Sequence, residues 1–273
     1  MSTPKITSMI SEMIQTYLDR RVSRTAASLA YFLILSIFPM VICLYAMLGE
    51  LFPAVQTIEE LLRGVLPAET VETIIEYLAY VSSNSSGGMI FSAIIATVTT
   101  SGTAFRTIHN AMGEITKQQR FSGIFTLIFS LVFSLIFLAA IYFAVIVMIT
   151  GGWFISFVAE HVSFIDIAAS WEWARFILLF GLMLLIIYGV YRITASKDNR
   201  IPLLRGAVLA AVALEIVSIL FSYFIGLSAR YSLLYGSLAS VMILMLWLYM
   251  CGNILLLGNI FNVVLYEHRT IKE

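Results

Sequence analysis

The sequence predicts an all-α, polytopic membrane protein in which six transmembrane helices form one bundle. Composition is the first reason, because 60% of the 273 residues are hydrophobic and only 12% are charged, and the mean hydropathy is +0.96. These values lie outside the range of soluble globular chains. The second reason is the recurrence of apolar stretches almost free of charge, each near the length of about twenty residues that a helix needs to cross hydrocarbon. The third is the concentration of Lys and Arg in alternate connections between these stretches.

Residues 1–24 are expected to form an amphipathic helix on the membrane surface, ahead of the first apolar stretch. Apolar residues recur there at three- and four-residue spacing, as on one helical face: Ile6, Met9, Ile10, Met13, Ile14, Tyr17 and Leu18. Arg20, Arg21 and Arg24 follow this helix, and such residues attract the headgroups of anionic lipids.

The transmembrane spans are expected at residues 25–48, 87–112, 121–149, 173–191, 206–227 and 236–262. Pro39 lies inside the first span and should kink it, because proline lacks the N–H that a helical hydrogen bond uses. That span is too long for the apolar core of a signal peptide, and no small-residue cleavage site follows it. We therefore expect an uncleaved first helix and one domain over residues 1–273.

The first outer connection, residues 49–86, is too long and too regular to be an unstructured loop. Its apolar residues share one helical face and its acids another: Val71, Ile74, Ile75 and Leu78 against Glu69, Glu72 and Glu76. We expect one or two short amphipathic helices here, which cap the outer side of the bundle and end before Gly87 and Gly88.

The distribution of positive charge predicts the orientation. With the N-terminus in the cytoplasm, twelve Lys and Arg residues lie on the cytoplasmic side, and only Arg63, Arg175 and Arg230 lie outside. This bias predicts that both termini are cytoplasmic.

Glu215 and Arg106 are the two charged residues that interrupt apolar stretches. Glu215 is expected near the middle of the fifth span, with Ser218 and Ser222 on the same weakly polar face. A carboxyl group at that depth is costly, so it either handles protons, cations or a bound headgroup, or it is neutral or paired and holds the bundle together. The sequence leaves both readings open.

Arg106 is expected one or two turns from the cytoplasmic surface, with Gly102, Thr103, His109, Asn110 and Gly113 on its side of the second span. Snorkelling of its long side chain to the interface is one explanation. The other is a functional one, in which the guanidinium binds a phosphate or carboxylate. His109 is read as an interfacial hydrogen-bonding residue rather than a catalyst.

Polar and small residues also line other spans. The third span repeats them every four residues, at Ser122, Thr126, Ser130 and Ser134, a pattern that favours close helix packing over a polar pathway. Asn259 and Asn262 lie toward the cytoplasmic end of the last span and must face protein or water.

Several classes of chemistry find no support in the sequence. Cys43 and Cys251 fall inside apolar spans and are read as small buried hydrophobes, and no Cys or His spacing resembles a metal-ligand set. No glycine-rich phosphate loop indicates the use of ATP, and the net charge of zero gives no field for nucleic acid. We therefore expect no metal, no cofactor and no nucleic-acid partner.

Three ordered segments resemble the YihY/virulence factor BrkB family of membrane proteins, formerly labelled ribonuclease BN-like. They are residues 26–39 in the first span, residues 101–112 in the second, and residues 235–239, 246–249 and 255–258 in the last. The resemblance implies a six-helix protein of the bacterial cytoplasmic (inner) membrane, and it places Arg106, Glu215 and Pro39 where the family tends to have these residues. The chain departs from the family by having Asn259 to Asn262 after Gly258, where a glutamate is frequent, and by having Ser218 and Ile219 where a basic residue is frequent.

Three functions are compatible with these residues. The favoured one is transport of a small ion or an amphiphilic anion, such as a lipid, across the bilayer. A structural or assembly factor of the envelope is the alternative, with the acidic outer helices as its docking surface. A membrane-bound ribonuclease is the least favoured, because the cytoplasmic acids are scattered and such hydrolysis needs carboxylates gathered around metals. The lipid bilayer is the expected partner; a homo-oligomer is compatible with the sequence but is not predicted by it.

Overall fold

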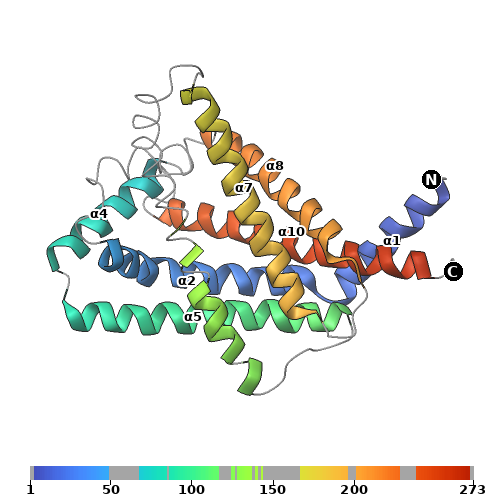
Figure 1. Cartoon of the computed structure of the whole chain (residues 1–273), viewed down its shortest axis with the longest axis horizontal. Helices are drawn as coiled ribbons and strands as arrows, with labels where there is room; N and C mark the ends of the chain where they lie inside the picture. Colours follow the sequence, from blue (N-terminus) through green and yellow to red (C-terminus); the bar gives the residue numbers. More distant parts are fainter. Residues whose placement is uncertain are drawn as a thin grey trace.

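The computed structural model of the chain is helical over almost all of the residues it describes, and it has no strand among them. These are residues 3–48, 68–84, 86–116, 124–126, 128–136, 139–140, 143, 167–195, 201–227 and 238–270. Figure 1 shows the helices in order: α1 (Thr3–Asp19), α2 (Val22–Leu48), α4 (Ala68–Asn84), α5 (Gly87–Thr116), α7 (Ile167–Thr194), α8 (Leu203–Leu227) and α10 (Leu238–Thr270). The expectation of an all-helical chain is therefore confirmed for this part of the protein.

Four helices in the described part are long and apolar enough to cross a membrane. They cover Gly87–Thr116, Ile177–Thr194, Leu203–Phe221 and Val241–His268. Two shorter apolar helices, Val22–Ile37 and Ile124–Ile136, fall within the expected first and third spans. Most of the expected third span, 121–149, and residues 49–67 of the outer connection lie outside the described residues. The count of six spans therefore stays a prediction.

α10 continues past the expected end of the last span at residue 262 and reaches Thr270. Its final turns carry Glu267 and His268, and α1 packs alongside them. The contact is visible at His268, whose Nε2 atom lies 2.8 Å from a carboxylate oxygen of Glu12 on α1. The part of α10 beyond residue 262 thus forms part of its contact with α1.

The junction of α1 and α2 is a tight turn at Arg21, whose φ of 50° is in the left-handed region. α1 then lies against α10, with Met9, Met13 and Tyr17 packed on the main hydrophobic core. Ile10, Ile14 and Leu18 on the adjoining side stay exposed. The apolar side of α1 is thus divided between a contact with α10 and an outward surface.

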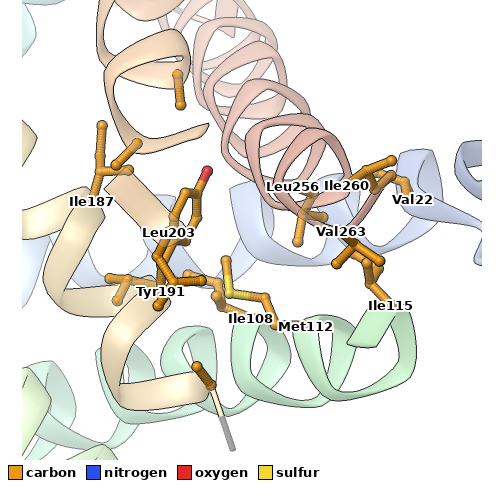
Figure 2. Packing of buried hydrophobic residues seen from close by; sticks show 14 of the residues in the cluster. Val22, Ile108, Met112, Ile115, Ile187, Tyr191, Leu203, Leu256, Ile260 and Val263 are labelled. Carbon is orange, nitrogen blue, oxygen red and sulfur yellow. The ribbon is translucent and has the colours of Figure 1, made fainter. Parts of the chain in front are cut away.

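The main core lies where α2, α5, α7, α8 and α10 meet. Figure 2 shows side chains from these helices converging, among them Ile108 of α5, Tyr191 of α7 and Leu256 of α10. α5 packs chiefly against α2, and α10 packs against α2 and α8, so these helices form the frame across which α7 runs (Figure 1). Both chain ends lie at the same end of the bundle (Figure 1).

α4 is the described part of the outer connection, and it packs against α2. Val71 is buried, whereas Glu72 and Glu76 are exposed. Tyr77 packs on a second small core that includes Ile42 and Cys43 of α2. Burial raises the pKa of Tyr77, and the neighbouring Tyr80 adds to the shift. α4 ends at Asn84 and α5 begins at Gly87.

Candidate functional site

Arg106 lies on α5, ten residues before the helix ends at Thr116. At about 1.5 Å per residue this is about 15 Å from that end of the helix. Its guanidinium Nη2 donates a 2.7 Å hydrogen bond to Thr103 Oγ1, one turn nearer the N-terminus of α5. The side chain therefore points toward the N-terminal end of the helix, and the depth of Arg106 in the membrane stays a prediction.

The residues expected on the Arg106 side of α5 divide into two groups. Gly102, His109 and Gly113 are buried, and the His109 ring stacks on Phe105 with 6.2 Å between ring centroids. Thr103 and Arg106 are half-buried, and Asn110 is exposed. The structure thus turns His109 into the bundle and leaves Arg106 and Asn110 on the outer side of α5.

Buried Gly102 is where the third span approaches α5. A Cβ atom at Gly102 would lie 3.4 Å from Ser134 Oγ and 3.5 Å from Ser130 Oγ. Both serines are buried, and Ser134 donates to the Ser130 carbonyl oxygen over 2.7 Å. These two members of the serine stripe occupy a close helix contact, which is the packing arrangement that small residues permit.

Glu215 lies on α8 at the boundary between a packed and an exposed face. Ala211 and Ser218, four residues before and three after it, lie on the packed side, where Ala211 is fully buried. Val212 and Ile219 on the other side are exposed, and Glu215 itself is half-buried. Ser218 Oγ accepts a 3.4 Å hydrogen bond from Trp247 Nε1 of α10. Ser222 lies one turn further along α8, and its side chain is outside the described part.

Glu215 and Arg106 make no ion pair with each other among the described residues. Each is, however, the chain neighbour of a residue that lines one central cavity of about 160 Å³, namely Leu214 on α8 and Phe105 on α5. Ser101 and Cys251 are the polar members of the described lining, and no charged residue belongs to it. Neither Arg106 nor Glu215 lines this cavity, and its described lining is almost entirely apolar.

Asn262 joins the C-terminal half of α10 to the start of α8. Its Oδ1 accepts a 2.7 Å hydrogen bond from the Gly206 N–H, and its Nδ2 donates over 3.0 Å to the Leu203 carbonyl oxygen. The Gly206 N–H belongs to the first turn of α8, where backbone donors have no partner within the helix. Asn262 therefore caps α8 from another helix and is fully buried.

Asn259 lies one turn before Asn262, and only 3% of its surface is exposed. Its Nδ2 atom has no hydrogen-bond partner among the described residues. The two asparagines, which the sequence placed together at one polar end of the span, therefore differ in their hydrogen bonding. Asn262 forms two hydrogen bonds with α8, whereas the Nδ2 group of Asn259 has no acceptor among the described residues.

Close packing of α8 on α10 depends on residues that the sequence reading did not single out. A Cβ atom at Gly206 would overlap the Gly258 carbonyl oxygen. Tyr191 of α7 donates a 2.6 Å hydrogen bond to the Leu255 carbonyl oxygen, beside the same glycines. The sequence pattern around Gly206 does not indicate this contact, because its partners on α10 lie more than fifty residues away in the chain.

A second cavity, of about 330 Å³, lies where α1 crosses α10 and the end of α5. Glu12, Asp19 and Glu267 line it together with Arg20. Nearby, Tyr17 donates a 2.8 Å hydrogen bond to Asn253 Oδ1 of α10. Burial raises the pKa of Tyr17, and Tyr249 adds to the shift, so the hydroxyl remains a donor at neutral pH.

Pro39 lies inside α2, which continues through it as a helix; the expected kink stays a prediction. Cys43 is buried, with its Sγ 3.7 Å from Thr97 Oγ1, and Cys251 is half-buried; both are free thiols. In the part of the chain that the structure describes, no three His, Cys, Asp or Glu side chains gather as a metal site would require.

Comparison with known proteins assigns the chain to a family. The family described as "Virulence factor BrkB" matches residues 13–273. The chain is 24% identical to the "Putative ribonuclease-like protein YfkH" of Bacillus subtilis, over 97% of this chain and 98% of that protein. It is 27% identical to the "UPF0761 membrane protein VP0125" of Vibrio parahaemolyticus, over 99% of this chain and 86% of that protein. No solved structure matches. The family match, the relatives and the apolar helices agree that the chain is a membrane protein, and it belongs to the virulence factor BrkB family.

Proposed function

We propose that this protein transports a small ion or an amphiphilic anion, such as a lipid, across the bacterial cytoplasmic membrane. The observation that carries the proposal is the placement of Arg106 and Glu215. Both are half-buried on helices long enough to cross a membrane, and neither neutralises the other. Ionisable groups at membrane depth are costly and are retained mainly where they handle a substrate or ion.

The proposal includes six spans with both termini in the cytoplasm. The first and third spans are supported by the apolar helices Val22–Ile37 and Ile124–Ile136, which add to the four longer ones. Both chain ends lie at one end of the bundle (Figure 1), as an even number of crossings requires. The excess of Lys and Arg in the terminal and alternate connections supports the cytoplasmic assignment.

Between the two substrate classes, the central cavity favours the amphiphilic anion. Its described lining has no charged residue, so it offers little to a bare ion. Its volume of about 160 Å³ is close to that of an engineered apolar cavity of about 150 Å³ that binds benzene. An apolar space of this size suits hydrocarbon rather than a bare ion.

Flux measured in proteoliposomes tests the proposal. The parent, Arg106→Gln and Glu215→Gln are reconstituted and compared with empty vesicles, using a panel of inorganic ions, fatty acids and labelled phospholipids. Glu76→Gln serves as the matched control, since it removes an exposed carboxylate from α4 rather than from a spanning helix. We expect flux of one substrate by the parent and the control, and reduced flux by the two other variants. A parent that moves nothing above empty vesicles would rule out transport.

A second candidate function, an envelope assembly factor, is supported by the acidic outer face of α4, where Glu72 and Glu76 are exposed. Deleting residues 55–82 while retaining membrane insertion distinguishes the two functions. An assembly factor should lose its cellular function and keep any flux, whereas a transporter should show parallel losses. The nuclease reading would require metal-dependent turnover by the purified protein that a chelator abolishes.

A further inference from the structure

The outer face of α5 is polar from Thr99 to Glu114, whereas its exposed residues nearer the N-terminus include Phe91, Ile94 and Ile95. Five residues at three- and four-residue spacing share the polar face, which we call the α5 polar stripe: Thr99, Thr103, Arg106, Asn110 and Glu114. Thr103 and Arg106 are half-buried and the other three are exposed. From Thr99 to Glu114 the stripe extends about 22 Å at about 1.5 Å per residue, compared with the roughly 30 Å thickness of the hydrocarbon.

Other spanning helices have outer faces of the opposite character. On α7 the exposed residues include Ile177, Leu178 and Leu185, and on α8 they include Val208 and Tyr223. Apolar outer faces are what contact with lipid chains requires, because polar groups facing hydrocarbon are costly. The α5 polar stripe breaks this rule on a helix that otherwise qualifies as a membrane span.

The hydroxyl groups of the stripe can tolerate this position because they bond to their own helix. Thr99 donates to the Ile95 carbonyl oxygen and Thr103 to the Thr99 carbonyl oxygen, each over 2.8 Å. Each hydroxyl oxygen keeps lone pairs with which to accept further hydrogen bonds. The stripe is therefore stable in an apolar setting and still has polar atoms to offer a ligand.

Arg106 remains the group that the helix does not neutralise. A guanidinium has five N–H donors, and in the described part of the chain Arg106 donates to the neutral Thr103 hydroxyl. Its side chain is half-buried, and an arginine inside a spanning helix favours a negatively charged partner. The planar guanidinium fork matches phosphate oxygens, which it can bind through two parallel hydrogen bonds.

We infer that the α5 polar stripe binds the phosphate headgroup of a membrane phospholipid, with the phosphate on Arg106 and the acyl chains in the surrounding bilayer. This inference rests on the proposed transport function and names its substrate class. An open stripe suits a lipid better than an ion, because an ion needs an enclosed wet path whereas a lipid keeps its chains in the membrane. Glu114 lies two turns after Arg106, at the C-terminal end of the stripe. Its carboxylate repels a phosphate there, which favours binding of the headgroup at Arg106.

Contact with the headgroup is measured by fluorescence quenching on the full-length protein in vesicles. A fluorophore is attached to Thr99→Cys, on the stripe, or to Gly181→Cys, on the apolar outer face of α7, with Cys43 and Cys251 replaced by alanine. Thr99 is thirteen residues from Met112, and Gly181 is thirteen from Thr194, which contacts Met112. Both label sites thus lie thirteen residues along their helices from the same contact between α5 and α7, and a Cβ atom at Gly181 meets no atom within 4 Å. The quencher is a phospholipid with a nitroxide on its headgroup.

We expect stronger quenching at Thr99→Cys than at Gly181→Cys. Arg106→Gln should weaken the affinity for the phospholipid headgroup by about tenfold, as expected for the loss of a hydrogen bond to a charged group. The difference in quenching between the two labels should shrink accordingly. Arg106→Lys keeps the charge and should retain part of the difference, so a variant that fails to fold does not decide the test. Adding free inorganic phosphate should leave the quenching unchanged, because the ligand is the lipid.

Equal quenching at the two positions overturns the inference, even if the parent transports another substrate. Quenching confined to the stripe in a protein without flux overturns the proposed transport function and leaves the headgroup site in place. Transfer of labelled phosphatidylglycerol between leaflets is then compared with transfer of a labelled glucosyl lipid that lacks phosphate. The role of the phosphate is also overturned if the glucosyl lipid is transferred as fast as the phospholipid and Arg106→Gln leaves that transfer unchanged.

Discussion

Replacing Gly206 with alanine tests the contact between α8 and α10. The new Cβ atom would overlap the Gly258 carbonyl oxygen and lie 2.5 Å from Asn262 Nδ2. Backbone atoms of α10 cannot rotate away, so α8 must move or Asn262 must leave its place. In the second case the two hydrogen bonds from Asn262 to Gly206 and Leu203 are lost.

Overpacking of a tight contact costs about 1–3 kcal/mol, and interhelical hydrogen bonds in membranes contribute about 0.6 kcal/mol each. The helix propensity gained over glycine offsets roughly what the two hydrogen bonds contribute, so we expect Gly206→Ala to lower the free energy of unfolding by about 1–3 kcal/mol. The assay is reversible unfolding of the full chain in mixed micelles of dodecyl maltoside and SDS, followed by far-ultraviolet circular dichroism.

Gly189→Ala is the matched control, because a Cβ atom at Gly189 meets nothing within 4 Å. It should leave stability unchanged or raise it by up to about 1 kcal/mol, the helix propensity gained over glycine. In an Asn262→Ala background, Gly206→Ala should cost about 1 kcal/mol less, since one of its clashing groups is gone. If Gly206→Ala unfolds at the SDS fraction of the parent, the contact is not close-packed and the reasoning is wrong.

Three further variants test other contacts by the same unfolding assay or by proteolysis. Gly252→Ala should lower the free energy of unfolding by about 1 kcal/mol, less than Gly206→Ala, because its Cβ atom would lie 3.3 Å from Ala26 rather than overlap a backbone atom. An equal loss of stability in the two variants would contradict this order. Tyr191→Phe should cost about 1 kcal/mol by removing the 2.6 Å hydrogen bond to the Leu255 carbonyl oxygen, and an unchanged midpoint would show that the bond contributes nothing. Tyr17→Phe removes the hydrogen bond from α1 to α10 and should speed protease cleavage in α1 without changing the global unfolding midpoint; a shifted midpoint would mean that α1 unfolds with the bundle.

The positions of the helices could be predicted closely from the sequence. α2, α5 and α8 begin or end within a few residues of the expected spans. Their length and hydrophobicity depend only on local sequence, since transfer of about twenty apolar residues into hydrocarbon is favourable whatever the rest of the chain does. The extension of α10 to Thr270 was not predicted, because it accompanies packing of α1 along residues that hydropathy alone assigns to the cytoplasm.

The candidate site could be predicted only in part. The sequence singled out Arg106 and Glu215, because charges inside apolar stretches are visible without a structure. It grouped His109 with Arg106, since both fall on one broad side of a helix, whereas the fold buries His109 and leaves Arg106 half-exposed. Helical spacing indicates which residues share one side of a helix, but it does not indicate which side faces the bundle.

Local sequence is enough to identify this chain as a helical membrane protein of the virulence factor BrkB family. Composition and the length of apolar runs carry that information residue by residue. Packing of the helices, in contrast, brings Asn262 to the start of α8, brings Gly206 against Gly258, and turns the polar face of α5 outward. These features depend on contacts between residues far apart in the chain, and no local pattern specifies which helix a given face will meet.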